Sequence, residues 1–113
     1  MGDEKRQFLL TAAWMFMRHG QPARARAVFE ALAEADPHDG VVSVALAQLL
    51  LDDGEAEKAV ELLKRADVPN SLEHAEAVLE TRALRLSGRE REANARWNRY
   101  IESQKGASRQ WLA

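Results

Sequence analysis

Residues 20–37 read GQPARARAVFEALAEADP and carry the clearest pattern in the chain. Gly20 opens this segment, and Ala25 and Phe29 follow it. The same residue types recur twice at intervals of 34 residues, as Gly54, Ala59, Leu63 and as Gly88, Ala93, Trp97. Glycine tolerates the positive φ that ends a helix, a small alanine lets two helices cross closely, and a bulky residue fills the space between them. The recurrence predicts a series of similar helix pairs.

This period and these residue types resemble the tetratricopeptide repeat, a helix–turn–helix unit of 34 residues. The resemblance implies an all-α fold, a short solenoid of three helix hairpins with about six helices. We expect a single domain over residues 1–113, with repeats at about 6–39, 40–73 and 74–107 and a tail at 108–113. The expected helices cover residues 4–19, 22–35, 41–53, 56–67, 71–87 and 90–104.

Local signals support several of these helix boundaries. Pro22 is placed to open the second helix, where its missing N–H is not needed. Asn70, with Glu73 three residues later, predicts a capping box at the start of the fifth helix. Pro69 comes earlier than Pro37 does in the first repeat, so the fourth helix should end early. The third repeat has no closing proline, which leaves the last helix free to run on toward the C-terminus.

Composition narrows the class of protein. The 113 residues contain no cysteine, which removes disulfides and thiolate chemistry and fits a reducing compartment. The apolar stretch at residues 8–17 fits the first repeat in register and lacks a small-residue cleavage site, so it is interpreted as a helix and not as a signal peptide. No stretch approaches the length of a membrane span. We therefore expect a cytoplasmic protein without membrane insertion.

The net charge of −2 conceals an uneven distribution. Residues 1–81 contain 8 Lys/Arg and 15 Asp/Glu, whereas residues 82–113 contain 8 Lys/Arg and 3 Asp/Glu. The basic end is either a solvated helix face or a surface that steers an acidic partner. Nucleic acid is a weaker option, because Trp97 and Tyr100 occupy packing positions of the repeat and offer no stacking platform.

Catalytic and metal chemistry find little support in the sequence. His19, His38 and His74 lie near helix boundaries in different repeats, and none has a second ligand at the spacing of a zinc-binding helix. The acidic residues around Gly54 are expected to supply charge at helix ends. A general acid–base pair would need a pocket that shifts a pKa, and nothing in the sequence indicates one. We expect no enzyme activity, no cofactor and no metal.

The first helix of each repeat lines the inner face of such an array. Trp14 falls on that face, whereas Trp97 falls on the core position shared with Phe29 and Leu63. Trp111 lies beyond the third repeat and is expected to cap the last helix pair, with folding into the groove or contacting a partner as the alternatives. The candidate partner-binding groove consists of Leu10, Trp14, Met17, Val41, Val44, Gln48, Leu51, Val78, Arg82 and Arg85.

Most of these groove positions are apolar, which favours a ligand with an apolar stripe. An amphipathic helix or an extended apolar segment of another protein would bury large anchors there, each worth roughly 1.5–3 kcal/mol. The arginines at the rim would favour acidic residues beside that stripe. Because the array is short and curved, one or two of the side chains that line such a groove are expected to pack internally. An empty apolar groove also predicts self-association of the free chain.

Two stretches carry a more specific resemblance. Gln7-Phe8-Leu9-Leu10 with Trp14, Gly20 and Arg24-Ala25 is similar to the YscY/SctY class of type III secretion chaperones. The same similarity holds from Arg82-Ala83 through Gly88 and Ala93 to Tyr100-Ile101-Glu102, and the length also fits. Phe8-Leu9-Leu10 with Trp14 carries most of the specific weight, since the other residues belong to the general repeat pattern.

The resemblance implies a bacterial cytoplasmic chaperone of a type III secretion system. Its partner would be a small secreted, SctX-like subunit, which it keeps soluble and helps to present to the export gate. A related possibility is an SctG-type chaperone of the needle subunit, which works with a small co-chaperone. A generic repeat adaptor or scaffold remains open. Adaptors that capture a C-terminal carboxylate need a clamp of Lys, Arg and Asn within the groove, and here the arginines lie only at the rim.

Overall fold

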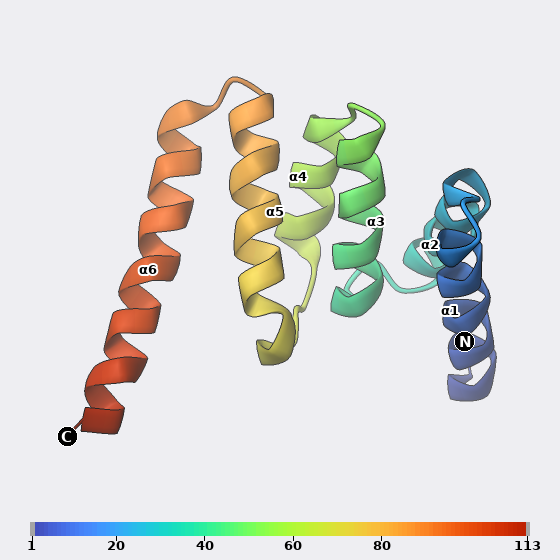
Figure 1. The fold of residues 1–113 in the computed structure, drawn as a ribbon, viewed down its shortest axis with the longest axis horizontal. Helices are drawn as coiled ribbons and strands as arrows, with labels where there is room; N and C mark the ends of the chain where they lie inside the picture. The colour runs from blue at the N-terminus through green and yellow to red at the C-terminus, as the bar shows by residue number, and fades with distance from the viewer. Residues whose placement is uncertain (1, 113) are drawn as a thin grey trace.

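A computed structural model describes the backbone of residues 2–112 and the side chains of residues 2–109. Within this part of the chain there are six α-helices and one short 3-10 turn, arranged as consecutive hairpins (Figure 1). The α-helices are α1 (Asp3–Arg18), α2 (Pro22–Ala35), α3 (Gly40–Asp52), α4 (Ala56–Arg65), α5 (Glu73–Leu86) and α6 (Glu90–Leu112), and the 3-10 turn η1 is Asn70–Leu72. The expected all-α solenoid of helix hairpins is confirmed.

The three repeated glycines end the first helix of each hairpin. Gly20, Gly54 and Gly88 have φ values of 69°, 78° and 76°, and they are the residues with positive φ among those described. Each is the residue at which the chain turns from one helix of a pair into the next. The sequence expectation for these three positions is confirmed.

The hydrophobic core follows the repeat between the helices. Ala25, Ala59 and Ala93 are fully buried, which lets the helices of each pair approach closely. Phe29 and Leu63 are 1% and 2% exposed, as expected for core positions. Each helix packs on its neighbour in sequence, and α3 also contacts α5, so α3 lies at the centre of the array.

The start of the fifth helix departs from the sequence expectation. The capping box at Asn70 and Glu73 is wrong: η1 occupies this position, and α5 begins after Leu72 without a side-chain cap. Pro69 precedes η1 with extended backbone, and the chain tightens into a 3-10 turn before the helix forms. In contrast, α4 does end early, at Arg65, and α6 continues to Leu112 in the absence of a closing proline.

The loops before α3 and after α4 touch each other. Asp39 and Asp67 form an isolated parallel bridge, and the Asp67 N–H donates to the His38 carbonyl at 2.9 Å. The His38 imidazole Nδ1 lies 2.8 Å from the Arg65 carbonyl oxygen. Gly40 starts α3 directly against the Asp67 backbone. This contact fixes the first repeat against the second at one edge of the array.

Asp39 also links the first helix to the third. Its carboxylate accepts from Arg6 Nε at 2.7 Å and from Arg6 Nη2 at 3.2 Å, and it caps α3 by accepting from the Val42 N–H at 3.3 Å. The hydrogen bond from Arg6 lowers the pKa of Asp39 below 3.8, its ordinary value, and the Val42 N–H acts in the same direction.

This depressed pKa predicts an acid-sensitive contribution to stability. The contribution is complete above about pH 5, and it is lost as pH falls through the lower pKa of folded Asp39. Asp39→Ala should cost about 1–2 kcal/mol at pH 7, measured by urea unfolding. Asp39→Asn retains a capping oxygen and should lose less. The difference between Asp39→Asn and the parent protein should shrink between pH 5 and pH 2, and an unchanged difference over that range would contradict the assignment.

Candidate functional site

A hollow lined mainly by first helices of the hairpins opens on the inner side of the array. Its volume is about 350 Å³. Trp14 and Met17 of α1, Val44 and Gln48 of α3, and Val78 of α5 all contribute to its wall. The remaining lining residues are Phe29, Ala45, His74, Ala75 and Leu79. Three helices that are distant in sequence therefore form one apolar surface.

Trp14 is the largest exposed side chain of this hollow. It is 49% exposed, and its indole meets the Phe29 ring edge-on, with centroids 5.8 Å apart and planes at 77°. Phe29 is itself buried, so it supports the indole from the core, while the indole remains half exposed along the hollow. An aromatic group that is both held in place and accessible is the kind of side chain that dominates protein interfaces.

A second hollow of about 340 Å³ continues from the first toward the C-terminal hairpin. Val78 belongs to both hollows. The other lining residues are Thr81, Arg82, Arg85, Leu86 and Trp97. We call the two hollows together the trough. Along α5 the trough extends from Ala75 to Leu86, which corresponds to about 16 Å at 1.5 Å per residue. That length accommodates about three turns of a ligand helix.

The sequence model of the tetratricopeptide repeat family matches residues 16–79, which is more than half of the chain. The chain belongs to the tetratricopeptide repeat family. Repeats of this family are typically non-catalytic modules that bind other proteins. No curated protein and no solved structure matches the chain. The family thus establishes a protein-binding fold, and the identity of the partner has to be argued from the trough.

Seven of the ten side chains predicted for the groove of this tetratricopeptide array line the trough. They are Trp14, Met17, Val44, Gln48, Val78, Arg82 and Arg85. Leu10 and Leu51 do not, because they are only 7% and 5% exposed and belong to the hydrophobic core. Leu51 lies on α3, which is covered by α2, α4 and α5, and Leu10 packs into the core with Ala13. Val41 is half-buried and lies outside both hollows.

Trp97 is the main lining residue that the sequence interpretation missed. It was assigned to the core with Phe29 and Leu63, yet it is half-buried and lines the second hollow. Phe29 and Leu63 are each followed by another hairpin, whereas no further hairpin follows Trp97 within the described residues. The position of Trp97 in the last repeat is the sequence signal that could have indicated its partial exposure. Tyr100 supports it, with ring centroids 5.5 Å apart.

Positive charge is concentrated at the C-terminal end of the trough. Arg82 and Arg85 are exposed there. Arg85 is held by Glu90 and Asn94, with Nε–Oε1 and Nη2–Oδ1 distances of 3.1 Å each. Arg96 lies in the same hairpin but binds Glu80 and Glu76 between α5 and α6. Arg82 and Arg85 are therefore the cations that a ligand in the trough would meet.

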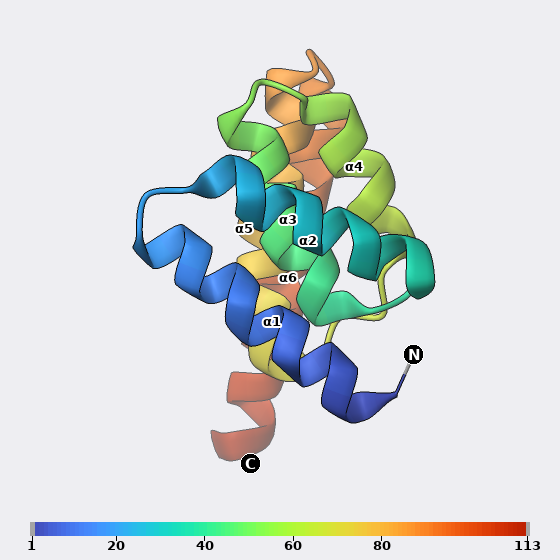
Figure 2. The same ribbon diagram turned by 90° about the vertical axis from the view of Figure 1, so that its right-hand side faces the viewer.

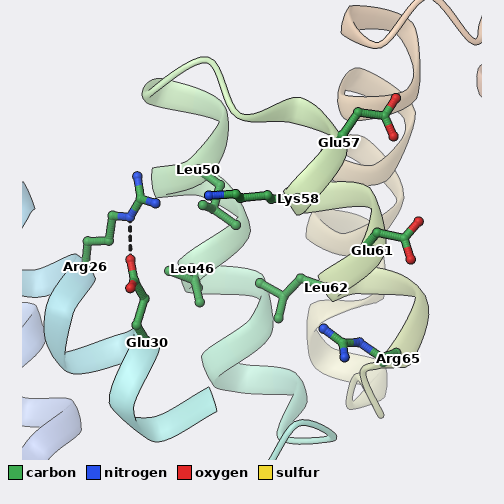
Figure 3. Close-up of a pocket in the computed structure, with 9 residues that line it drawn as sticks. All are labelled: Arg26, Glu30, Leu46, Leu50, Glu57, Lys58, Glu61, Leu62 and Arg65. Carbon is green, nitrogen blue, oxygen red and sulfur yellow. Dashed lines mark hydrogen bonds and ion pairs between the residues drawn. The ribbon is translucent and has the colours of Figure 1, made fainter. Parts of the chain in front are cut away.

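A further cavity lies on the outer side, between α2 and α4, with a volume of about 400 Å³ (Figure 3). Its floor consists of Leu46, Leu50 and Leu62, which are only 4%, 5% and 7% exposed. In Figure 3, Lys58 reaches toward Leu50, whereas Glu57 and Glu61 point away from the cavity. The floor offers a ligand little apolar area, so this cavity is a seam between repeats.

An ionic cluster closes one end of this seam. Arg26 bonds to Glu30, Asp53 and Glu55, which come from α2 and from the turn between α3 and α4. The hydrogen bond with Glu55 is the largest cause of the raised pKa of Arg26, and the same bond lowers the pKa of Glu55 to about 2. These side chains are already paired with one another. Their arrangement stabilises the contact between the first and second repeats.

Three further sequence expectations concern metal binding, membrane insertion and Trp111. Among the side chains of residues 2–109, no group of three or more acidic, histidine or cysteine residues could hold a metal ion. None of the helices within residues 2–112 combines the length and apolarity that a membrane span requires. The predicted cap by Trp111 concerns a side chain outside the described residues, although the backbone there continues α6.

Proposed function

We propose that this tetratricopeptide protein is a chaperone for a small secreted subunit of a bacterial type III secretion system. In this proposal an amphipathic helix or apolar segment of an SctX-like subunit occupies the trough. The chain would act in the bacterial cytoplasm, keep the subunit soluble and help to present it to the export gate. Binding and release of a protein segment would be its whole activity, without catalysis.

The observation that carries this proposal is the composition of the trough. Trp14, Met17, Val44 and Val78 line the first hollow, and apart from the indole N–H of Trp14 its hydrogen-bonding side chains are Gln48 and His74. A segment that is insoluble before assembly exposes large apolar side chains, and burying each one contributes roughly 1.5–3 kcal/mol. The two arginines at one end would select acidic residues beside that apolar stripe.

The resemblance to YscY/SctY chaperones supports the same proposal through residues at two different places. Trp14 lies in the trough, and Leu10 lies in the core beneath α1. Phe8 is 71% exposed on α1 and takes part in neither. The similar stretch thus includes a trough residue, a packing residue and an exposed residue.

A generic adaptor or scaffold that captures short peptides is the second candidate. Carboxylate-binding adaptors present Lys, Arg and Asn inside the groove, whereas the cations of this trough lie only in the second hollow. An SctG-type chaperone of a needle subunit would use the same apolar trough. It would differ by requiring a small co-chaperone, and co-purification of the native complex distinguishes the two.

Co-expression with an SctX-like subunit tests the proposed function. At a concentration about 100 times the dissociation constant, the subunit should stabilise the folded chain by about 2.7 kcal/mol, or roughly 10 °C in melting temperature. Trp14→Ala should weaken binding about 30-fold and remove most of this shift, because it removes the largest apolar anchor. Lys58→Ala on the outer side is the matched control and should bind like the parent protein. A melting temperature that no such subunit changes would argue for the adaptor.

A further inference from the structure

The solvent-facing side of α1 carries an uncovered stripe that is separate from the trough. Glu4, Phe8, Thr11, Met15 and Arg18 follow one another at alternating steps of four and three residues, so they lie on one face of the helix. All five are exposed, and Phe8 and Met15 are 71% and 54% exposed. Figure 2 shows α1 at the front of the array, where no other drawn helix lies over it. We call these five residues the α1 stripe.

The helix at the opposite end of the array, α6, provides a comparison for the polarity of the α1 stripe. On α6 the corresponding exposed stripe consists entirely of polar residues, Arg91, Asn94, Asn98, Glu102 and Lys105. Repeat arrays need such polar faces at their ends to remain soluble. The α1 stripe has charged residues only at its two ends, and between them lie two large apolar side chains with Thr11 in the middle. This end of the array therefore lacks the polar face that ends the other.

The order of residues along the α1 stripe is symmetric about its centre. Thr11 is the middle residue, and an antiparallel second copy of α1 centred on it would place Phe8 against the copy's Met15. The same arrangement would place Glu4 against the copy's Arg18. Thr11 already donates its hydroxyl hydrogen to the Gln7 carbonyl at 2.9 Å, so its polar hydrogen needs no partner at such a contact.

Electrostatics favours this antiparallel arrangement over a parallel one. α1 has Asp3 and Glu4 in its first turn and Arg18 in its last turn. In an antiparallel pair the acidic turn of each helix meets the basic turn of the other, and the two helix dipoles also oppose each other. A parallel pair would bring like charges together at both ends. The charge pattern and the apolar pattern thus both favour an antiparallel second copy of α1.

We propose that the α1 stripe is a self-association surface on which a second copy of this chain packs with its own α1 antiparallel. The contact is isologous, so it closes as a dimer and does not propagate into filaments. Trp14 precedes Met15 and lies about 100° further round the helix, so the trough stays accessible on both copies. This inference is independent of the ligand that the trough binds.

The small size of the stripe makes this dimer weak. A helix of this length is about 24 Å long and about 10 Å wide, which gives a contact of roughly 240 Å² per copy. Stable interfaces bury about 800 Å² per partner. We therefore expect a weak dimer that forms only at a high concentration of the chain.

Sedimentation equilibrium of the full chain between about 5 and about 500 µM tests the proposal. The parent chain should pass from monomer to dimer, and Phe8→Glu should weaken the dimer at least about 10-fold while helicity is unchanged. Trp14→Ala should leave it intact. A chain that stays monomeric throughout, grows beyond a dimer, or loses its dimer in Trp14→Ala but not in Phe8→Glu would overturn the proposal.

A charge exchange tests the antiparallel geometry. Glu4→Arg and Arg18→Glu should each weaken the dimer several-fold, and the chain with both substitutions should recover it, since each pair is then restored with reversed sign. Without recovery, the antiparallel pairing is wrong. Because the natural chain has no cysteine, Thr11→Cys should form a disulfide-linked dimer on oxidation, whereas Glu61→Cys on α4 should not. Equal cross-linking of the two variants would also refute it.

Discussion

Gly40→Ala is expected to destabilise the fold by about 3 kcal/mol or more, the largest stability effect among single-methyl changes in this chain. A Cβ at this position would lie 2.1 Å from the Asp67 carbonyl oxygen and 2.6 Å from the Val68 Cα. Both are backbone atoms, so no side chain can turn aside to make room. The loop after α4 would have to separate from the start of α3, which breaks the bridge between Asp39 and Asp67.

Two other glycines provide matched controls for this prediction. A Cβ at Gly106 in α6 meets nothing within 4 Å, so Gly106→Ala should stabilise the helix by up to about 1 kcal/mol. Gly20→Ala also meets nothing, but its φ of 69° should cost about 1–2 kcal/mol. In urea unfolding, Gly106→Ala should be the most stable of the three variants, Gly20→Ala should be less stable, and Gly40→Ala should be the least stable. If Gly40→Ala were as stable as Gly20→Ala, the loop contact would be looser than described.

Gly40 also shows where sequence reasoning about this fold stops. Gly20, Gly54 and Gly88 were predictable because their requirement is local: each ends a helix at a fixed place in the repeat. The requirement at Gly40 comes from Asp67, which is far away in sequence, and no periodic pattern marks it. The predicted capping box at Asn70 was wrong for a related reason. Asn70 and Glu73 are favourable cap residues in the local sequence, but the chain forms a 3-10 turn at this place instead.

The candidate site was predictable to the extent that repeat register fixes helix faces. Register placed Trp14, Val44 and Val78 on one surface because each belongs to a first helix, and all three line the first hollow. It could not show that Leu51 is covered on all sides, since this depends on how closely the neighbouring helices approach α3. It also could not show that Trp97 is partly open, because burial at that position requires a following hairpin.

Val78→Asp is expected to cause the largest loss of partner binding, at least about 100-fold, or about 3 kcal/mol. Val78 is 39% exposed and is shared by the two hollows, so a carboxylate there would interrupt the trough at its middle. The proposed ligand would have to bury this carboxylate beside its apolar anchors, even where Arg82 one turn further along α5 pairs with it. It would also carry acidic residues near Arg82, which the new carboxylate would repel.

Three comparisons separate this effect from general damage to the fold. Val78→Thr keeps the shape with a neutral hydroxyl and should weaken binding far less than Val78→Asp. Leu51→Asp would place a charge in the core and unfold the chain, so loss of binding in that variant carries no information about the trough. Arg82→Glu with Arg85→Glu should slow association and reduce its salt dependence, because exposed charges act mainly on the encounter. If Val78→Asp stayed helical and bound the SctX-like subunit like the parent chain, the ligand would have to lie elsewhere, and the α1 stripe would be the next surface to test.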